Sequence, residues 1–260
     1  MRPLKFHPIL KQTLWGGERI IPYKELASGL SRVGESWELS GMPGSESVVA
    51  EGPWAGSTLS ELIGRFGAEL LGKANYARFG QEFPLLVKFI DAREDLSIQV
   101  HPDDELARKR HGKSGKCEMW YVLEAEPGAS LLTGFSRPIA PAEYERRVAD
   151  NTLTDVLNRQ AIASGDVFYL PAGRVHSIGK GSFIVEIQQS SDITYRIYDF
   201  DRRDAAGNSR ELHTELAREA IDFESSENSR ITYAPENNQE VRLVTTPYFT
   251  TSLYTLTART

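Results

Sequence analysis

One stretch of twelve residues constrains the fold of this chain more than any other. Gly165, Pro171, Gly173 and His176 are spaced as G-x5-P-x-G-x2-H, and apolar residues occupy 167–170. This order predicts a β-strand, a Pro/Gly turn that reverses the chain, and a histidine at the start of the next strand. We expect His176 to face the interior of a β-barrel, as a ligand or as a hydrogen-bonded core histidine.

Short strand-like segments recur along the rest of the chain. Residues 85–90 have the composition of a buried strand, and residues 96–101 alternate with period two. Further candidates cover 119–123, 129–132, 183–188, 194–198, 241–245 and 252–256. Many short strands separated by Gly, Pro and charged turns favour a β-sandwich or barrel. A doubly wound sheet is disfavoured, because strand–helix alternation and a Gly-rich phosphate turn are both absent.

Four segments have the spacing of apolar residues that is typical of helices. They cover residues 59–71, 103–108, 141–159 and 214–221. The first has Ser57 or Thr58 available as an N-cap, and the second opens with acidic residues. The third is expected to form two helices that are broken near Asn151. The helices are thus segregated from the strands rather than alternating with them.

Composition and charge narrow the class of protein. Lys and Arg number 30 and Asp and Glu 36, so the formal net charge is −6. A mildly acidic chain without a Lys/Arg cluster is a poor candidate for binding nucleic acid. The single cysteine, Cys117, excludes an internal disulfide and fits a reducing compartment. The longest nearly apolar stretch, 83–90, contains Lys88 and is too short to cross a membrane. Because residues 1–6 lack the apolar core of a signal peptide, we expect a soluble cytoplasmic protein.

Several side chains stand where a metal site could form. On the strand at 96–101, Gln99 and His101 are two residues apart and therefore point to the same face. Glu118 enters an apolar strand at 119–123, which is costly unless the carboxylate is paired, protonated or bound to a cation. Lys116 could pair with Glu118. Each of these features alone also fits an ordinary structural role.

Taken together, these segments resemble the type I mannose-6-phosphate isomerase family. The segments that carry the resemblance are 15–17 (Trp-Gly-Gly), 34–38, 96–102, 116–118, 171–176 and 186–196. They lie within a region that runs from about residue 6 to about residue 220. The resemblance implies a mainly β fold, namely a cupin-type β-barrel (jelly roll) with a small helical insertion at about 141–160. We expect a catalytic domain over 1–238 and the start of a truncated second β-domain over 239–260.

The resemblance also implies one zinc ion per chain. Its ligands would be Gln99, His101, Glu118 and His176. Two imidazoles with a carboxylate and an amide oxygen suit zinc and leave room for water or substrate. By ligand type alone, iron, manganese and nickel are almost as acceptable, so the preference for zinc depends on the resemblance. In most other cupins a histidine stands where Gln99 stands.

The implied reaction interconverts mannose 6-phosphate and fructose 6-phosphate through a cis-enediol. The residues that match catalytic positions are Lys116, Arg196 and Glu186, and those that match substrate-binding positions are Lys88, Ser97 and Asp192. Lys116 is the first candidate for the proton-transferring base and Glu186 the second. The expected partner is a small sugar phosphate, bound by a monomer or homodimer. His7 and His213 have no partners at ligand spacing, and His111 lies in a basic helix end.

Two departures from the pattern leave other functions open. The chain stops at Thr260, soon after a segment at 246–250 that resembles the start of the family's second domain, so it is a naturally short or a truncated form. Lys180 stands where the cupin signature often has asparagine. The alternatives are a catalytically silent sugar-phosphate-binding cupin and a metal-dependent cupin oxygenase. Gln99, together with the pair Lys116 and Arg196, argues against the oxygenase.

Overall fold

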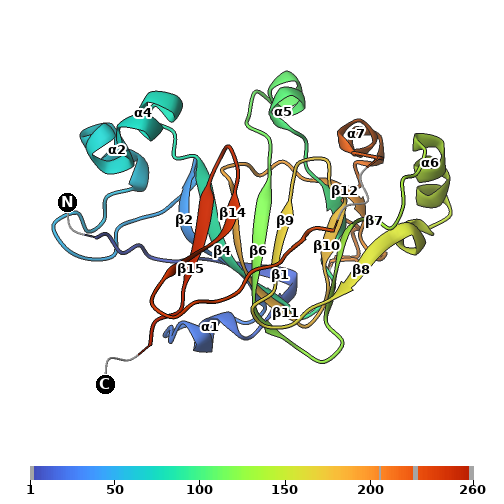
Figure 1. The fold of residues 1–260 in the computed structure, drawn as a ribbon, viewed down its shortest axis with the longest axis horizontal. Coiled ribbons are helices and arrows are strands. Elements are labelled where there is room, and N and C mark those ends of the chain that lie inside the picture. The colour runs from blue at the N-terminus through green and yellow to red at the C-terminus, as the bar shows by residue number, and fades with distance from the viewer. Residues whose placement is uncertain (1–2, 205, 225–227, 258–260) are drawn as a thin grey trace.

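Two antiparallel β-sheets packed face to face form the centre of the fold (Figure 1). The computed structural model describes residues 3–204, 206–224 and 228–257. The outermost residues of the two expected domains, 1–2 and 258–260, lie outside this description. A mainly β fold is confirmed, and its two facing sheets have the arrangement of a jelly roll. Within the described ranges, no strand of one sheet pairs with a strand of the other, so the barrel is not closed by strand pairing.

The larger sheet has eight strands in the order β13-β9-β6-β11-β4-β1-β2-β3. They are β1 (Ile9–Gly17), β2 (Val33–Met42), β3 (Ser45–Glu46), β4 (Leu85–Ala92), β6 (Glu118–Ala125), β9 (Val167–Leu170), β11 (Ser182–Gln189) and β13 (Arg230–Ile231). Central strands β4, β6 and β11 match the apolar segments of the sequence. β1 and β2 were not expected as strands.

The smaller sheet has five strands in the order β12-β5-β10-β7-β8. They are β5 (Ile98–Val100), β7 (Ser130–Phe135), β8 (Leu157–Ala161), β10 (His176–Ile178) and β12 (Tyr195–Tyr198). Alternation is clear in β5, where Ile98 and Val100 are fully buried on one face and Gln99 points to the other. β12 lies at one edge of this sheet.

Apolar side chains fill the space between the sheets and cover both outer faces. Trp120 and Ile90 of the large sheet pack against Leu131 and Ile178 of the small one. On the outer face of the small sheet lie α6 (Pro141–Ala149) and α7 (Thr214–Ala220). The hairpin of β14 (Glu240–Thr245) and β15 (Thr250–Tyr254) packs on the outer face of the large sheet. The C-terminal β segment is therefore attached to the main fold through an apolar face.

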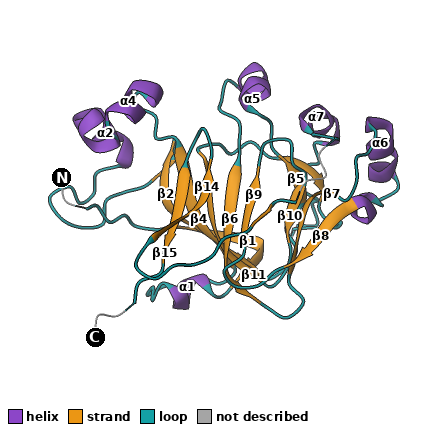
Figure 2. Ribbon diagram, viewed as in Figure 1, coloured by secondary structure: helices purple, strands orange, loops and turns teal. Residues whose placement is uncertain are grey.

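The remaining helices lie at the two ends of the sheets (Figure 2). They are α1 (Ile20–Tyr23), α2 (Leu59–Phe66), α3 (Ala68–Leu71), α4 (Lys73–Phe79) and α5 (Asp104–His111). Thr58 caps α2 in a capping box with Glu61, as expected, but Gly67 at φ 48° breaks the helix expected over 59–71. None of the helices in the described ranges has the length and apolar character needed to cross a membrane.

The segment expected to form two helices over 141–159 forms only one α-helix. After α6 the chain makes a 3₁₀ turn, η1 (Leu153–Val156), and then enters β8, which pairs with β7. Leu153 and Val156 are three residues apart, a spacing that fits one 3₁₀ turn as well as an α-helix. Pairing with the exposed edge of β7 then decides in favour of a strand.

The environment of Cys117 gives a test of this packing. Cys117 is 2% exposed and lies in the apolar cluster that includes Phe249 of the hairpin segment. Burial raises the pKa of its thiol to about 12, because a thiolate is poorly solvated there. We predict that the folded protein resists a thiol reagent at mildly alkaline pH and reacts after denaturation.

The Phe249→Ala variant should destabilise the fold by about 3 kcal/mol and react faster. Leu256→Ala, at a position 79% exposed, is the matched control and should label like the wild type. Labelling of the native protein at the rate of a free thiol would contradict this packing.

Candidate active site

Three buried side chains from both sheets converge between them. They are His101, directly after β5, and the first residues of β6 and β10, Glu118 and His176. Their ligand atoms lie within 4.8 Å of one another, and the three residues are at most 2% exposed. His176 Nε2 is 3.2 Å from Glu118 Oε1, and His101 Nε2 is 3.4 Å from Glu118 Oε2.

The Pro/Gly turn before His176 fixes the position of both histidines. Gly173 has φ 85°, a conformation that favours glycine, and its N–H donates to the carbonyl oxygen of His101 at 2.9 Å. In β10, His176 is paired in register with Gln99 of β5. The spacing noted in the sequence therefore corresponds to a turn that ties the two metal-ligand candidates together.

The hydrogen bonds of the two imidazoles determine which nitrogen faces the cluster. Nδ1 of His101 lies 2.8 Å from the carbonyl oxygen of Ile193, and Nδ1 of His176 lies 2.8 Å from that of Arg174. Because a carbonyl oxygen only accepts, each Nδ1 carries the proton and each Nε2 presents a lone pair. Burial, followed by the positive charge of Lys116, lowers the pKa of His101 to about 3, and burial lowers the pKa of His176. Both rings are therefore neutral.

Lys116 supplies the positive charge that this cluster of acceptors requires. Its Nζ is 2.5 Å from Glu118 Oε2 and 3.1 Å from His101 Nε2. Burial would raise the pKa of Glu118, but the positive charge of Lys116 holds it well below its usual value. Glu118 Oε1 is buried and accepts no hydrogen bond from the part of the chain that the structure describes. Two imidazole lone pairs and a carboxylate with a free oxygen fit a divalent cation.

Gln99 lies beside this cluster. Its Nε2 is 3.3 Å from His176 Nε2, and the hydroxyl of Ser97 is 3.4 Å from its Oε1. Ser97 itself is 3% exposed. Gln99 thus lies next to His176, and Ser97 lies next to Gln99.

A row of alternating charges continues from the cluster across the inner face of the large sheet. Lys88 Nζ lies 3.0 Å from Glu186 Oε1 and 3.7 Å from Glu35 Oε1. Two indole N–H groups hold these carboxylates, Trp120 donating to Glu186 at 2.7 Å and Trp37 donating to Glu35 at 2.6 Å. Burial would lower the pKa of Lys88, but the carboxylates of Glu186 and Glu35 raise it. Lys88 is therefore a fixed cation.

Arginines lie at the edge of the small sheet, on and after β12. Arg196 of β12 is paired in register with Gln99 and so shares its face. Its Nη1 donates to the carbonyl oxygen of Glu211 at 3.0 Å, whereas its buried Nε has no hydrogen-bond partner among the described residues. Burial and the nearby charges of Arg210 and Arg202 lower the pKa of Arg196. Nη1 of Arg202 is also buried, and no residue in the described ranges bonds to it. Unpaired guanidinium donors of this kind suit an anion.

The expected site residues differ in where they lie. Ion pairs and hydrogen bonds join Gln99, His101, Lys116, Glu118 and His176 to Lys88 and Glu186. Asp192 is instead exposed and pairs with Lys113 at 2.9 Å. Sequence reasoning gave no role to Glu35, Trp37 or Arg202. Glu35 and Trp37 belong to the segment 34–38, which carried part of the family resemblance. That resemblance could have identified both residues as candidates from the sequence.

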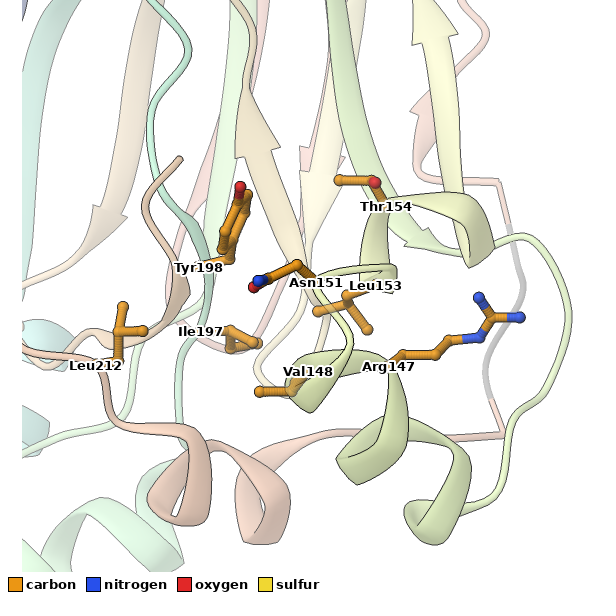
Figure 3. A pocket seen from close by; sticks show the side chains of 8 residues that line it. All are labelled: Arg147, Val148, Asn151, Leu153, Thr154, Ile197, Tyr198 and Leu212. Carbon is orange, nitrogen blue, oxygen red and sulfur yellow. The ribbon is translucent and has the colours of Figure 1, made fainter. Parts of the chain in front are cut away.

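A small cavity elsewhere in the molecule is lined by neither histidines nor carboxylates. It lies between α6, η1 and β12 and has a volume of about 40 Å³ (Figure 3). Its lining consists of Arg147, Val148, Asn151, Leu153, Thr154, Ile197, Tyr198 and Leu212. None of the expected site residues is among them, so the buried histidine cluster remains the candidate active site.

Metal binding to this cluster should be visible as a gain in stability. An ion that binds only the folded state at a free concentration 100 times its Kd stabilises that state by about 2.7 kcal/mol. We therefore expect Zn²⁺ to raise the Tm of the chelator-treated protein. The variant Glu118→Gln should lose this shift, whereas His7→Gln, at an exposed histidine, should keep it. An equal shift in the Glu118 variant would contradict binding at this cluster.

Two named relatives match most of this chain in sequence. A mannose-6-phosphate isomerase of Bacillus subtilis is 39% identical over 224 residues, which are 86% of this chain and 69% of that protein. A mannose-6-phosphate isomerase of Streptococcus mutans is 37% identical over 251 residues, which are 95% of this chain and 77% of that protein.

Solved structures and a family model also match this chain to phosphomannose isomerases. The crystal structure of a mannose 6-phosphate isomerase from Bacillus subtilis matches with a TM-score of 0.87 at 33% identity, over 96% of this chain and 79% of that one. A mutant phosphomannose isomerase from Salmonella typhimurium, at 16% identity and a TM-score of 0.69, shares the fold over 93% of this chain and 80% of that one. The model of the catalytic domain of type I phosphomannose isomerase matches residues 4–134. The chain thus belongs to the type I phosphomannose isomerase family.

Proposed function

We propose that this chain is a zinc-dependent isomerase that interconverts mannose 6-phosphate and fructose 6-phosphate. The observation that carries the proposal is the buried cluster of His101, Glu118 and His176, with the acid–base groups Lys116 and Glu186 beside it. Relatives named mannose-6-phosphate isomerase, at 37–39% identity, support the choice of substrate. The single cysteine supports a reducing, cytoplasmic location.

The metal would be held by His101, Glu118 and His176, with Gln99 as a fourth ligand. Rotation of the Gln99 amide would turn its oxygen toward the position that its nitrogen now occupies beside His176. A neutral amide adds no negative charge to the site. When bound, the ion would act as a Lewis acid that polarises the sugar carbonyl and stabilises negative charge on oxygen.

The isomerisation requires a proton to move between two carbon atoms. A base removes the proton from C2 of the open-chain aldose, and the carbonyl oxygen at C1 gains a proton, which gives a cis-enediol. The hydroxyl on C2 then loses its proton while C1 gains one, which gives the ketose. With a divalent ion supplying the positive charge of the cluster, Lys116 as a neutral amine is our first candidate for this proton transfer. Glu186, whose Oε1 lies 3.8 Å from Lys116 Nζ, is the second. Lys88 supplies a fixed positive charge next to Glu186.

The phosphate group needs cationic donors at a distance from the reacting carbons. We assign this role to Arg202, whose buried Nη1 has no partner among the described residues. Arg196 shares the face of Gln99, so we assign it to stabilising the enediolate or holding substrate oxygens. Ser97 contributes a hydroxyl on the same side as Gln99. Asp192 would contact substrate only if its ion pair with Lys113 opened.

A coupled assay tests the proposal directly. We expect the purified protein to form fructose 6-phosphate from mannose 6-phosphate, to lose this activity on treatment with a chelator, and to regain it with added Zn²⁺. Full activity after exhaustive metal removal would contradict the metal dependence. Thermal stabilisation by mannose 6-phosphate without turnover would select the silent binding protein, and oxygen uptake by the iron-loaded protein would select the oxygenase.

Two variants separate the candidates for the proton-transferring base. A general base typically contributes ~10²–10⁴-fold to the rate, so loss of the true base should reduce kcat by that factor. We expect Lys116→Met to suppress both isomerisation and the exchange of the C2 proton with solvent deuterium. Glu186→Gln should lower isomerisation while exchange persists. The reverse pattern would transfer the role to Glu186.

A further inference from the structure

His213 contacts the backbone of a residue that the proposed function uses. It lies directly before α7. Its Nδ1 accepts a hydrogen bond from the backbone N–H of Arg196 at 3.2 Å, and its own backbone N–H donates to the carbonyl oxygen of Arg196 at 2.6 Å. We propose that His213 is a positioning residue that holds Arg196 in place for the substrate. This inference rests on the proposed function.

The topology explains why Arg196 needs such a contact. β12 is an edge strand, so only its pairing with β5 is supplied by the sheet. The N–H and C=O groups of an edge strand require other partners. At Arg196 the side chain and backbone of His213 satisfy both groups. The segment 211–213 therefore takes the place of a neighbouring strand at this one residue.

The same segment also holds the guanidinium group. Nη1 of Arg196 donates to the carbonyl oxygen of Glu211 at 3.0 Å, so residues 211–213 contact both ends of the arginine. Arg202 and Arg210 carry like charges near Arg196 and would repel it. Fixing the backbone of Arg196 and one guanidinium nitrogen opposes this repulsion. No residue that the structure describes bonds to the buried Nε, which is thus available to a ligand.

The chemistry of the imidazole makes this role specific. To accept from Arg196, Nδ1 must lack a proton, and a neutral ring then carries its proton on Nε2. Nε2 lies 3.9 Å from a carboxylate oxygen of Glu211. An asparagine at this position can present its amide oxygen near the location of Nδ1. A glutamine extends its polar atoms toward the location of Nε2 and leaves the Arg196 N–H without an acceptor.

Two variants of nearly equal polarity test the proposal. For His213→Gln we expect kcat/KM for mannose 6-phosphate to fall by ~10- to 100-fold, the loss that a small displacement of a substrate-contacting group produces. His213→Asn should recover most of kcat/KM, because the acceptor is restored. Tm and circular dichroism of both variants provide the check on folding. Wild-type kcat/KM in the glutamine variant, or equal losses in both variants, would overturn the proposal.

A double-mutant cycle provides a second measurement that does not depend on recovery by asparagine. If the imidazole acts through the arginine, His213→Gln should cause no further loss of kcat/KM in an Arg196→Ala background. Additive losses would overturn the proposal and leave the proposed function intact. Absence of isomerisation in the metal-loaded wild type would instead overturn the proposed function, and this inference with it.

Discussion

Two neutral imidazoles and one carboxylate that face one another inside the protein impose the main constraint on this structure. Each Nδ1 is committed to a backbone carbonyl, so the two Nε2 lone pairs point at Glu118, which is itself an acceptor. Buried acceptors that face one another are unfavourable unless a positive charge lies between them. Lys116 supplies part of that charge through contacts to Glu118 and His101. A divalent ion on the same atoms would supply more and would leave the lysine next to the reacting sugar.

The fold serves this site by bringing short segments from both sheets together. Glu118 comes from the large sheet, and His101 and His176 come from the small one. The apolar layer of Trp120, Ile90 and their neighbours packs between the sheets. Charged residues occupy the remaining inner face of the large sheet, where Lys88 bridges Glu35 and Glu186. Low exposure keeps these charges paired, because an isolated buried charge would be costly.

The sequence predicted those parts of the fold and site that local pattern determines. The strands β4, β6, β9 and β11 are apolar segments, and the turn before His176 follows from Pro171 and Gly173. β1 and β2 were missed, since charged and polar residues on these strands, such as Glu35, break the apolar alternation that marks a strand. The roles proposed for Arg202 and His213 depend on how the chain between β12 and α7 folds back on Arg196. No local spacing encodes that contact.

X-ray absorption spectroscopy of the zinc-loaded protein tests the central claim most directly. The account predicts a first shell of nitrogen and oxygen only, at about 2.0–2.2 Å, with the outer-shell scattering of two imidazoles. The Glu118→Gln variant should not give this spectrum. A zinc–sulfur distance of about 2.3 Å, or a shell without imidazole, would place the ion elsewhere and contradict the assignment.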